Sequence, residues 1–217
     1  MIKAAIFDLD GTLCYTLTDL ANAVNFAVCE FGGKPHQIES FNKMVGDGMP
    51  VLIKRALPDA DDATLKKALK VFKKHYAEHL LDNTYLYDGI TETVKGLKEM
   101  GLKVAVFTNK DQSFAEQIVR EFFGNSFDVI LGGKPSLPKK PDPEGAFFIA
   151  RKLRVNTDEC AIIGDSSNDM ETARACGALA LGVPWGYRSV SELKNTGARF
   201  ICETPNDILK IIGEINL

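Results

Sequence analysis

Two aspartates, Asp8 and Asp10, follow the apolar run Ala4–Phe7 and precede Gly11. An ionised aspartate can attack phosphorus and form an acyl phosphate that water then cleaves. A second carboxylate beside it can protonate the leaving oxygen and later take a proton from the attacking water. Two such charges about 4 Å apart repel by roughly 4 kcal/mol at an effective dielectric near 20, so we expect bound Mg²⁺ to offset the repulsion.

Further candidate groups follow three later apolar runs, Val104–Phe107, Val129–Leu131 and Ala161–Ile163. Thr108 and Asn109 offer a hydroxyl and backbone amides where a phosphate can sit, and Lys140 offers a fixed cation. Asp165 is an oxygen ligand suited to magnesium, with Asp169 nearby as a support. Each feature alone is common turn chemistry, but their order after successive runs predicts one site.

Short apolar runs that alternate with helical periodicity predict an α/β fold with a parallel sheet covered on both faces. The same pattern continues at Leu179–Leu181. In such sheets ligands bind beyond the carboxyl ends of the strands. The candidate residues follow strand ends, so the fold would bring them together.

A long interval separates the first predicted strand from the second and reads as helices only, which predicts an inserted domain. We expect a catalytic core of residues 1–14 and 87–217 and a helical cap of residues 15–86. Its first helix would begin near Thr16, whose hydroxyl can cap free amides with Asp19 in support, and end near Gly32. Two more helical units are expected, in FNKMVGDGMPVLIKRAL and near residues 61–81.

The turn Gly46-Asp47-Gly48 lies inside the second of these units. Paired glycines allow backbone conformations and close approaches that larger residues resist. The turn is either a substrate-facing loop or a plain helix connection, and both interpretations stay open at this point.

Composition narrows the classes of partner. The net charge is −3 and the isoelectric point is near 5.7, so there is no basic field for nucleic acid or an anionic membrane. No apolar run approaches the roughly 18 residues that span a bilayer, and no signal peptide is evident, so we expect a cytoplasmic protein. Five scattered cysteines without a CxxC pair suggest neither a disulfide framework nor a zinc knuckle.

Four motifs together resemble the haloacid dehalogenase superfamily of phosphohydrolases, over nearly the whole chain. They are DLDGTL at residues 8–13, Thr108-Asn109, Lys140-Pro141 and GDSSND at residues 164–169. The chain resembles the phosphoglycolate phosphatase group in three features: the helical insertion, TNK at 108–110 and GVPWGYRS at 182–189.

The resemblance implies a Rossmann-like doubly wound core with a mobile helical cap, acting on a small phosphorylated metabolite, with 2-phosphoglycolate as the first candidate. It implies Asp8 as the nucleophile and Asp10 as acid and base. It also implies the remaining roles. Magnesium would bind the Asp8 carboxylate, the Asp10 backbone carbonyl and Asp165, supported by Asp169; Thr108, Asn109 and Lys140 would hold the phosphoryl group; and Gly46, Asp47 and Gly48 would help select the substrate.

Tyr15 departs from the family pattern, because relatives often have Asp-Ser where this chain has Tyr15-Thr16. We expect this change at the cap hinge to alter cap closure or substrate preference and to leave the phosphoryl chemistry intact.

Other functions stay open. A phosphomutase resembling β-phosphoglucomutase, a pyrophosphatase or a nucleotidase would use the same core motifs, and an inactive binding module would keep only the fold. His75, Glu78 and His79 fit the H-x-x-E-H zinc-protease pattern, but no third ligand is marked by a motif. The protein would be a monomer or a homodimer.

Overall fold

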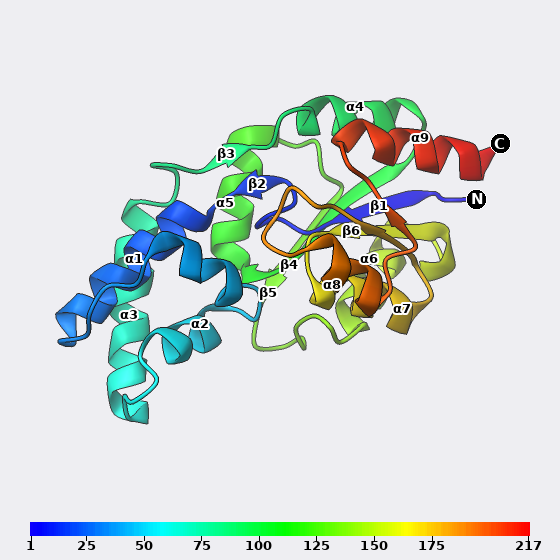
Figure 1. Cartoon of the computed structure of the whole chain (residues 1–217). Helices are drawn as coiled ribbons and strands as arrows, with labels where there is room; N and C mark the ends of the chain where they lie inside the picture. Colours follow the sequence, from blue (N-terminus) through cyan, green and yellow to red (C-terminus); the bar gives the residue numbers. More distant parts are fainter.

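A six-stranded parallel sheet forms the centre of the computed structural model, which describes all residues, Met1–Leu217 (Figure 1). The strand order is β5-β4-β1-β6-β7-β8, and every neighbouring pair is parallel. The strands are β1 (Ala4–Phe7), β4 (Lys103–Asp111), β5 (Val129–Gly133), β6 (Cys160–Gly164), β7 (Leu179–Gly182) and β8 (Phe200–Ile201). Strand β1 lies inside the sheet between β4 and β6, so its end is flanked on both sides.

All five predicted strands are present, and β1 has the predicted bounds. The other four extend one or more residues beyond the apolar runs. Strand β4 continues to Asp111, with a register shift after Phe107. The sixth strand, β8, was not predicted, because two residues at a sheet edge are too few to show a periodicity.

Helices cover both faces of the sheet, as predicted for a doubly wound fold. Alternate residues of β1 point to opposite faces, so Ala5 and Phe7 pack in one hydrophobic cluster while Ala4 and Ile6 pack in another. The first face is covered by α4 (Ile90–Glu99), α5 (Gln112–Phe123) and α9 (Pro205–Asn216). The second is covered by α6 (Glu144–Leu153), α7 (Ser167–Cys176) and α8 (Val190–Thr196), with a 3₁₀ turn at Thr157–Glu159 before β6.

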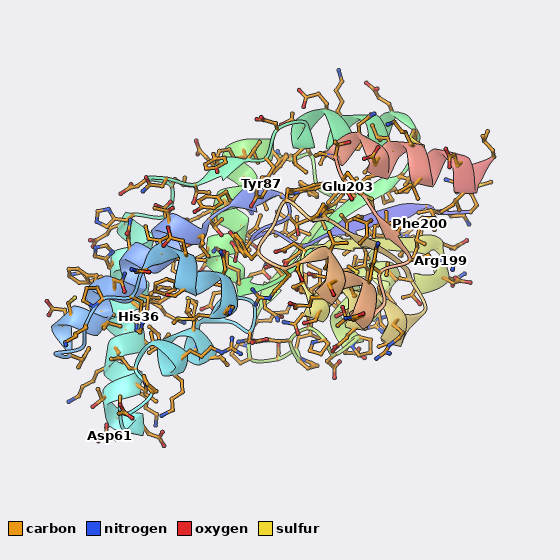
Figure 2. All side chains as sticks on the ribbon, in the orientation of Figure 1. His36, Asp61, Tyr87, Arg199, Phe200 and Glu203 are labelled. Carbon is orange, nitrogen blue, oxygen red and sulfur yellow. The ribbon has the colours of Figure 1, made fainter.

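A group of helices, which we call the helical lobe, lies to one side of the sheet (Figure 1). It consists of α1 (Leu17–Glu30), a 3₁₀ helix (Ile38–Lys43), α2 (Met49–Ala56) and α3 (Asp62–Glu78). Figure 2 places His36 and Asp61 in this lobe, at the opposite end of the molecule from Arg199 and Phe200. The three predicted helical units are therefore present.

Two short strands, β2 (Cys14–Tyr15) and β3 (Tyr85–Leu86), connect the lobe to the sheet. They pair with each other in antiparallel fashion, and the rings of Tyr15 and Tyr85 stack with their centroids 5.0 Å apart. The prediction that this interval contains only helices is therefore wrong. These strands are too short to show a pattern, and they form because the chain leaves and re-enters the core at neighbouring points.

The predicted cap of helix α1 is also wrong in its chemistry. Thr16 is the N-cap residue, but its hydroxyl makes no cap bond and instead donates to Asp10 Oδ1 at 2.6 Å. The Asp19 carboxylate is buried and accepts hydrogen bonds from Asn83 and Thr84, which lie just before β3 in the sequence. Tertiary partners have replaced the local bonds that the spacing suggested.

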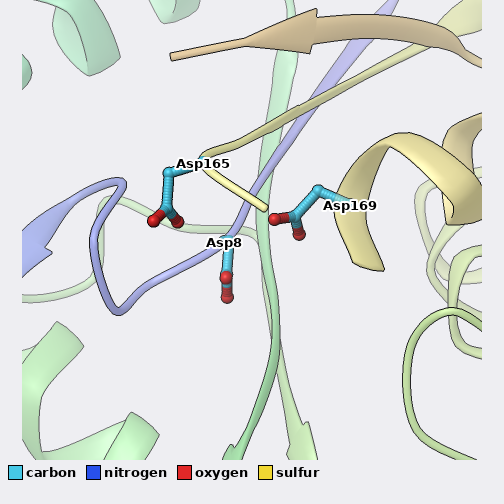
Figure 3. Close-up of side chains that lie close together, drawn as sticks. All are labelled: Asp8, Asp165 and Asp169. Carbon is cyan, nitrogen blue, oxygen red and sulfur yellow. The ribbon is translucent and has the colours of Figure 1, made fainter. Parts of the chain in front are cut away.

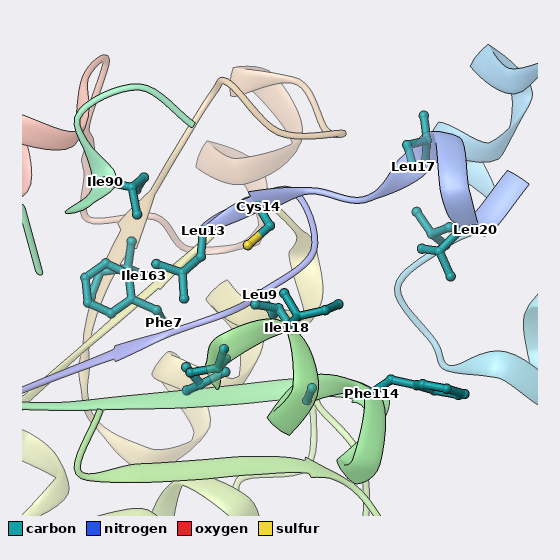
Figure 4. Packing of buried hydrophobic residues seen from close by; sticks show 14 of the residues in the cluster. Phe7, Leu9, Leu13, Cys14, Leu17, Leu20, Ile90, Phe114, Ile118 and Ile163 are labelled. Atoms are coloured by element: carbon teal, nitrogen blue, oxygen red, sulfur yellow. The ribbon is translucent and has the colours of Figure 1, made fainter. Parts of the chain in front are cut away.

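One hydrophobic cluster runs from the sheet into the lobe (Figure 4). It includes Phe7 and Ile163 in the sheet, Phe114 on α5, and Leu17 and Leu20 on α1. The lobe therefore packs on the core through apolar side chains. None of the helices combines the length and the apolar character that crossing a lipid bilayer requires.

Candidate active site

Two strand ends and the first turn of a helix bring three of the predicted acidic residues together. Asp8 follows β1 directly, Asp165 follows β6, and Asp169 lies in the first turn of α7. Figure 3 shows the three carboxylates pointing toward a common space, and their ligand oxygens all lie within 4.8 Å of one another. No other three or more His, Cys, Asp or Glu side chains in the chain come together in this way.

The carboxylate of Asp8 is bound on one oxygen only. Its Oδ1 accepts the backbone N–H of Leu9 at 2.7 Å and lies 3.0 Å from Lys140 Nζ. Burial raises the pKa of Asp8 to about 6 despite the opposing charge of Lys140. Every recorded contact uses Oδ1, so Oδ2 is left for a ligand or a reaction.

Asp169 is fully engaged by its neighbours. Its Oδ1 accepts from Lys140 Nζ at 2.6 Å, and its Oδ2 accepts from both the backbone N–H and the hydroxyl of Ser166. Lys140 is therefore held between Asp8 and Asp169, and these two charges raise its pKa to about 12 against the opposing effect of burial. This arrangement makes Asp169 a support for Lys140 and leaves it no free oxygen.

Asp165 lies in a tight backbone cradle. Its Oδ1 accepts from the Thr12 hydroxyl at 3.1 Å and its Oδ2 from the backbone N–H of Tyr187 at 2.7 Å. Gly11 has a φ of +82°, and a Cβ there would clash with this carboxylate. Burial raises the pKa of Asp165 to about 8, with further contributions from Asp169 and Asp8.

These residues fit a divalent metal ion. Four carboxylates in the site face only two lysines, so two negative charges are uncompensated when all are ionised: the acids are Asp8, Asp10, Asp165 and Asp169 and the bases are Lys110 and Lys140. Carboxylate oxygens are ligands that Mg²⁺ prefers. Burial is the main cause of the raised pKa values of Asp8 and Asp165, and the neighbouring carboxylates raise them further.

Asp10 has a separate set of partners. Its carboxylate lies 3.0 Å from Lys110 Nζ and accepts the Thr16 hydroxyl at 2.6 Å. Lys110 also donates to the Tyr76 hydroxyl of helix α3 at 2.7 Å. The Lys110 side chain is 2% exposed. A buried cation thus links the second aspartate to the helical lobe.

The predicted phosphate-binding residues gather at the same sheet edge. Thr108 and Asn109 are buried and line a cavity with Asp8, Asp10 and Asp165. The Asn109 side chain accepts the backbone N–H of Lys140 and donates to the Lys140 carbonyl. It also donates to Gly46 O at 2.8 Å. Lys140 does not line the cavity, but its Nζ forms an ion pair with Asp8, which does.

The turn from Gly46 to Gly48 faces the core. Gly46 and Gly48 line the same cavity, so the turn is not merely a helix connection. Asp47 does not line the cavity, because its carboxylate pairs with Arg55 and accepts from Asn168. Core groups also bind this segment's backbone, including Asn168 at Gly46 O and Arg188 at Val45 O.

The competing zinc motif lies on helix α3, away from these carboxylates. The rings of His75 and His79 are 4.4 Å apart, and His79 Nδ1 bonds Asp82 Oδ2 at 2.8 Å. The Nδ1 atom of His75 is buried without a partner. No three-ligand group forms here.

Nine residues of the cavity were not among the predicted site residues, and four of these nine are tyrosines or carry a positive charge: Tyr76, Lys110, Tyr187 and Arg188. Lys110 belongs to the TNK motif, and Tyr187 and Arg188 belong to GVPWGYRS, so both motifs held a signal that was used only for the resemblance. Tyr76 carried none, because a tyrosine on an amphipathic helix reads as core.

Three comparisons with known proteins agree with this geometry. Residues 2–177 match the family model for haloacid dehalogenase-like hydrolases. A phosphoglycolate phosphatase of Pseudomonas syringae pv. tomato is 36% identical over 192 residues, covering 85% of this chain and 70% of that protein. A phosphoglycolate phosphatase of Colwellia psychrerythraea is 32% identical over 215 residues, covering 95% of each chain.

Solved structures give the same picture. One, from Lactobacillus delbrueckii subsp. bulgaricus and provisionally assigned as a phosphoglycolate phosphatase, superimposes with a TM-score of 0.91 and 33% identity. The match covers 97% of this chain and 98% of that one. The chain therefore belongs to the haloacid dehalogenase-like hydrolase family, as a phosphoric monoester hydrolase that resembles phosphoglycolate phosphatases.

Proposed function

We propose that the protein is a Mg²⁺-dependent phosphatase that hydrolyses a small phosphate monoester, 2-phosphoglycolate, through a phosphorylated Asp8. One observation carries this proposal. Asp8 Oδ2 is free while its Oδ1 is held 3.0 Å from Lys140, and Asp10 lines the same cavity. The names of the relatives supply the candidate substrate.

In the first step Asp8 Oδ2 attacks phosphorus, and the bond from phosphorus to the ester oxygen breaks. Protonated Asp10 gives its proton to the departing oxygen, which leaves as the alcohol. Lys140, Thr108 and the backbone at Asn109 hold the phosphoryl oxygens, consistent with their places around Asp8.

In the second step water attacks phosphorus of the acyl phosphate and gives its proton to Asp10. Asp8 leaves as a carboxylate and inorganic phosphate is released. Lys110 and Thr16 hold the Asp10 carboxylate in place for both transfers. The same group therefore acts as an acid and then as a base.

The Asp8 and Asp165 carboxylates and the Asp10 backbone carbonyl would hold Mg²⁺. Bound there, the ion would offset the repulsion between the carboxylates and the phosphoryl oxygens. Asp169 would support this site by positioning Lys140, whose Nζ donates to its Oδ1.

The helical lobe would act as a mobile cap over this site, with residues 15–86 as its limits. The paired strands β2 and β3 support this assignment, because they are the two chain crossings between lobe and sheet. Gly46 and Gly48 would present the cap backbone to the substrate, consistent with their place in the cavity wall.

The test measures phosphate release from 2-phosphoglycolate by metal-depleted protein, with and without MgCl₂. We expect activity only with the metal, and we expect Asp8→Asn to lower kcat by at least ~10³-fold, because no covalent intermediate can form. Asp59→Asn, the same change at an exposed position, is the matched control and should keep wild-type activity.

Full activity without a metal, or in Asp8→Asn, would contradict the mechanism. Transfer of phosphate from one carbon to another of a hexose phosphate, with no phosphate released, would instead support a mutase. Release from pyrophosphate or a nucleotide alone would leave the chemistry and change the substrate.

A further inference from the structure

Arg188 brings a positive charge into the wall of the cavity, from the loop between β7 and α8. Its Nη2 donates to the carbonyl of Val45 at 2.9 Å, and its Nε lies 3.4 Å from Glu192 Oε1. Its Nη1 is buried and has no hydrogen-bond partner. Only one other buried side-chain nitrogen or oxygen of the chain, on His75, shares this state.

An unpartnered guanidinium nitrogen at this place needs a ligand. Arginine stays charged and offers its donors in a fixed plane that suits carboxylate and phosphate oxygens. A buried donor without an acceptor is costly, and the cost disappears when an anion binds. An anionic oxygen beside Nη1 would therefore be favourable.

The other cations of the site are already committed. Lys110 Nζ bonds Asp10 and the Tyr76 hydroxyl, while Lys140 Nζ lies between Asp8 and Asp169. Arg188 is the cation in which a buried donor nitrogen has no partner at all. It would therefore serve a second negative group, distinct from the phosphoryl group that Lys140 approaches.

The segment that carries Arg188 joins the acidic cluster to the lobe. The preceding residue, Tyr187, donates its backbone N–H to Asp165 Oδ2 at 2.7 Å, and successive Cα atoms are ~3.8 Å apart. On the other side, a Cβ at Gly46 would lie 3.8 Å from Arg188 Nη2. The backbone before Arg188 is thus bonded to the acidic cluster while the guanidinium contacts the lobe, so a small ligand in this cavity would bring a second anion toward Nη1.

We propose that Arg188 selects phosphate monoesters that carry a carboxylate close to the ester oxygen, by donating from Nη1 to that carboxylate. The inference rests on the proposed phosphatase function and adds a specificity residue to it. Arg188 takes no part in breaking the phosphate ester bond.

The experiment compares two substrates of similar size that differ in one group, 2-phosphoglycolate and 2-hydroxyethyl phosphate. The readout is the ratio of their kcat/KM values, measured with Mg²⁺. We expect wild type to prefer the carboxylate and Arg188→Met to lower the ratio by about 10- to 100-fold, as for the loss of a hydrogen bond to a charged group. Arg188→Lys should recover part of the preference, because it keeps the charge without the planar donors.

Asn168→Ala is the matched control, because Asn168 also ties the lobe to the core, through Gly46 O and Asp47. It should lower turnover of both substrates together and leave the ratio unchanged. Ethylene glycol bisphosphate tests whether Arg188 binds a second phosphate in place of a carboxylate. If Arg188→Met lowers turnover of this compound alone, the carboxylate assignment is overturned.

Different results would overturn the phosphatase function and the role of Arg188. If wild type hydrolyses neither ester, the proposed function is wrong. If it hydrolyses both but shows no preference, or if Arg188→Met lowers both equally, the phosphatase function stands and the role of Arg188 is overturned.

Discussion

The two sides of the cavity are built from different chemistry. The core side consists of charges at or near strand ends, among them the half-buried Asp8 and Asp10 and the buried Lys110 and Asp165. The lobe side consists mainly of backbone and of neutral or apolar side chains: Leu20, Val45, Gly46, Gly48, Met49, Leu52 and Tyr76. The charged groups are thus on the sheet side of the cavity, and the lobe supplies a mainly neutral surface.

The two sides meet through polar contacts in which the core mostly donates. Asn109 and Asn168 donate to Gly46 O, and Arg188 donates to Val45 O. Two of these three donors, Asn109 and Arg188, also line the cavity. A ligand in the cavity would therefore contact two of the groups that hold the lobe.

The largest effect is expected at Lys110, where core and lobe meet on one nitrogen. Lys110→Met removes the cation beside Asp10 and should lower kcat about 10- to 100-fold, the size of a lost hydrogen bond to a charged group. Tyr76→Phe removes only the lobe's bond to Lys110 and should lower kcat less than about fivefold. Initial rates with an aryl phosphate measure both. Equal losses in the two variants would show that the lobe contact, not the ion pair, matters.

An intermediate effect is expected on stability. The pKa of Asp165 is raised to about 8 by burial and by Asp169 and Asp8, whereas an unfolded aspartate has a pKa near 3.8. Between pH 6 and 8 the metal-free native state therefore holds a proton that the unfolded state lacks, so raising the pH favours unfolding. Wild type should lose about 1 to 2 kcal/mol relative to Asp165→Asn over this range, measured by thermal melts in EDTA.

Asp47, on the lobe side, is the contrasting control for that measurement. Burial raises its pKa, but the hydrogen bond from Asn168 and the pairing with Arg55 outweigh it and hold the pKa below the usual value. Its stabilising effect is present at pH values above the unfolded pKa, so Asp47→Asn should lower the melting temperature slightly at both pH 6 and pH 8. If the melting temperatures of wild type and Asp165→Asn changed by the same amount between pH 6 and pH 8, the raised pKa of Asp165 would be contradicted.

The smallest effect is expected at the linker strands. Tyr15→Asp breaks the stack on Tyr85 and should change kcat/KM about two- to tenfold, since aromatic pairs contribute ~0.5–1.5 kcal/mol. Tyr85→Leu, which breaks the same stack from the other strand, should give a change of similar size. Loss of turnover with every phosphate ester tested would show that Tyr15 takes part in the chemistry. In that case the linker strands would contribute to the chemistry as the core does.

The sequence by itself determined the sheet and the edge at which the acidic residues meet. Strands buried on both faces read as continuous apolar runs, so the bounds of Ala4–Phe7 were predictable to the residue. Parallel strands end at one edge of a sheet, so residues after successive runs had to converge there. Asp8, Thr108 and Asp165 were therefore found without the structure.

Only the tertiary structure decided which groups hold those residues and which remain free. Thr16 reads as a helix cap but bonds Asp10, and Asp19 reads as helix support but binds Asn83 and Thr84. The pairing of β2 with β3 and the bond from Lys110 to Tyr76 join segments far apart in the chain. The packing of distant segments also leaves Nη1 of Arg188 buried without a partner. Local periodicity records which face of an element is buried, but a hydrogen-bond partner is set by packing between distant elements, which no single stretch of sequence contains.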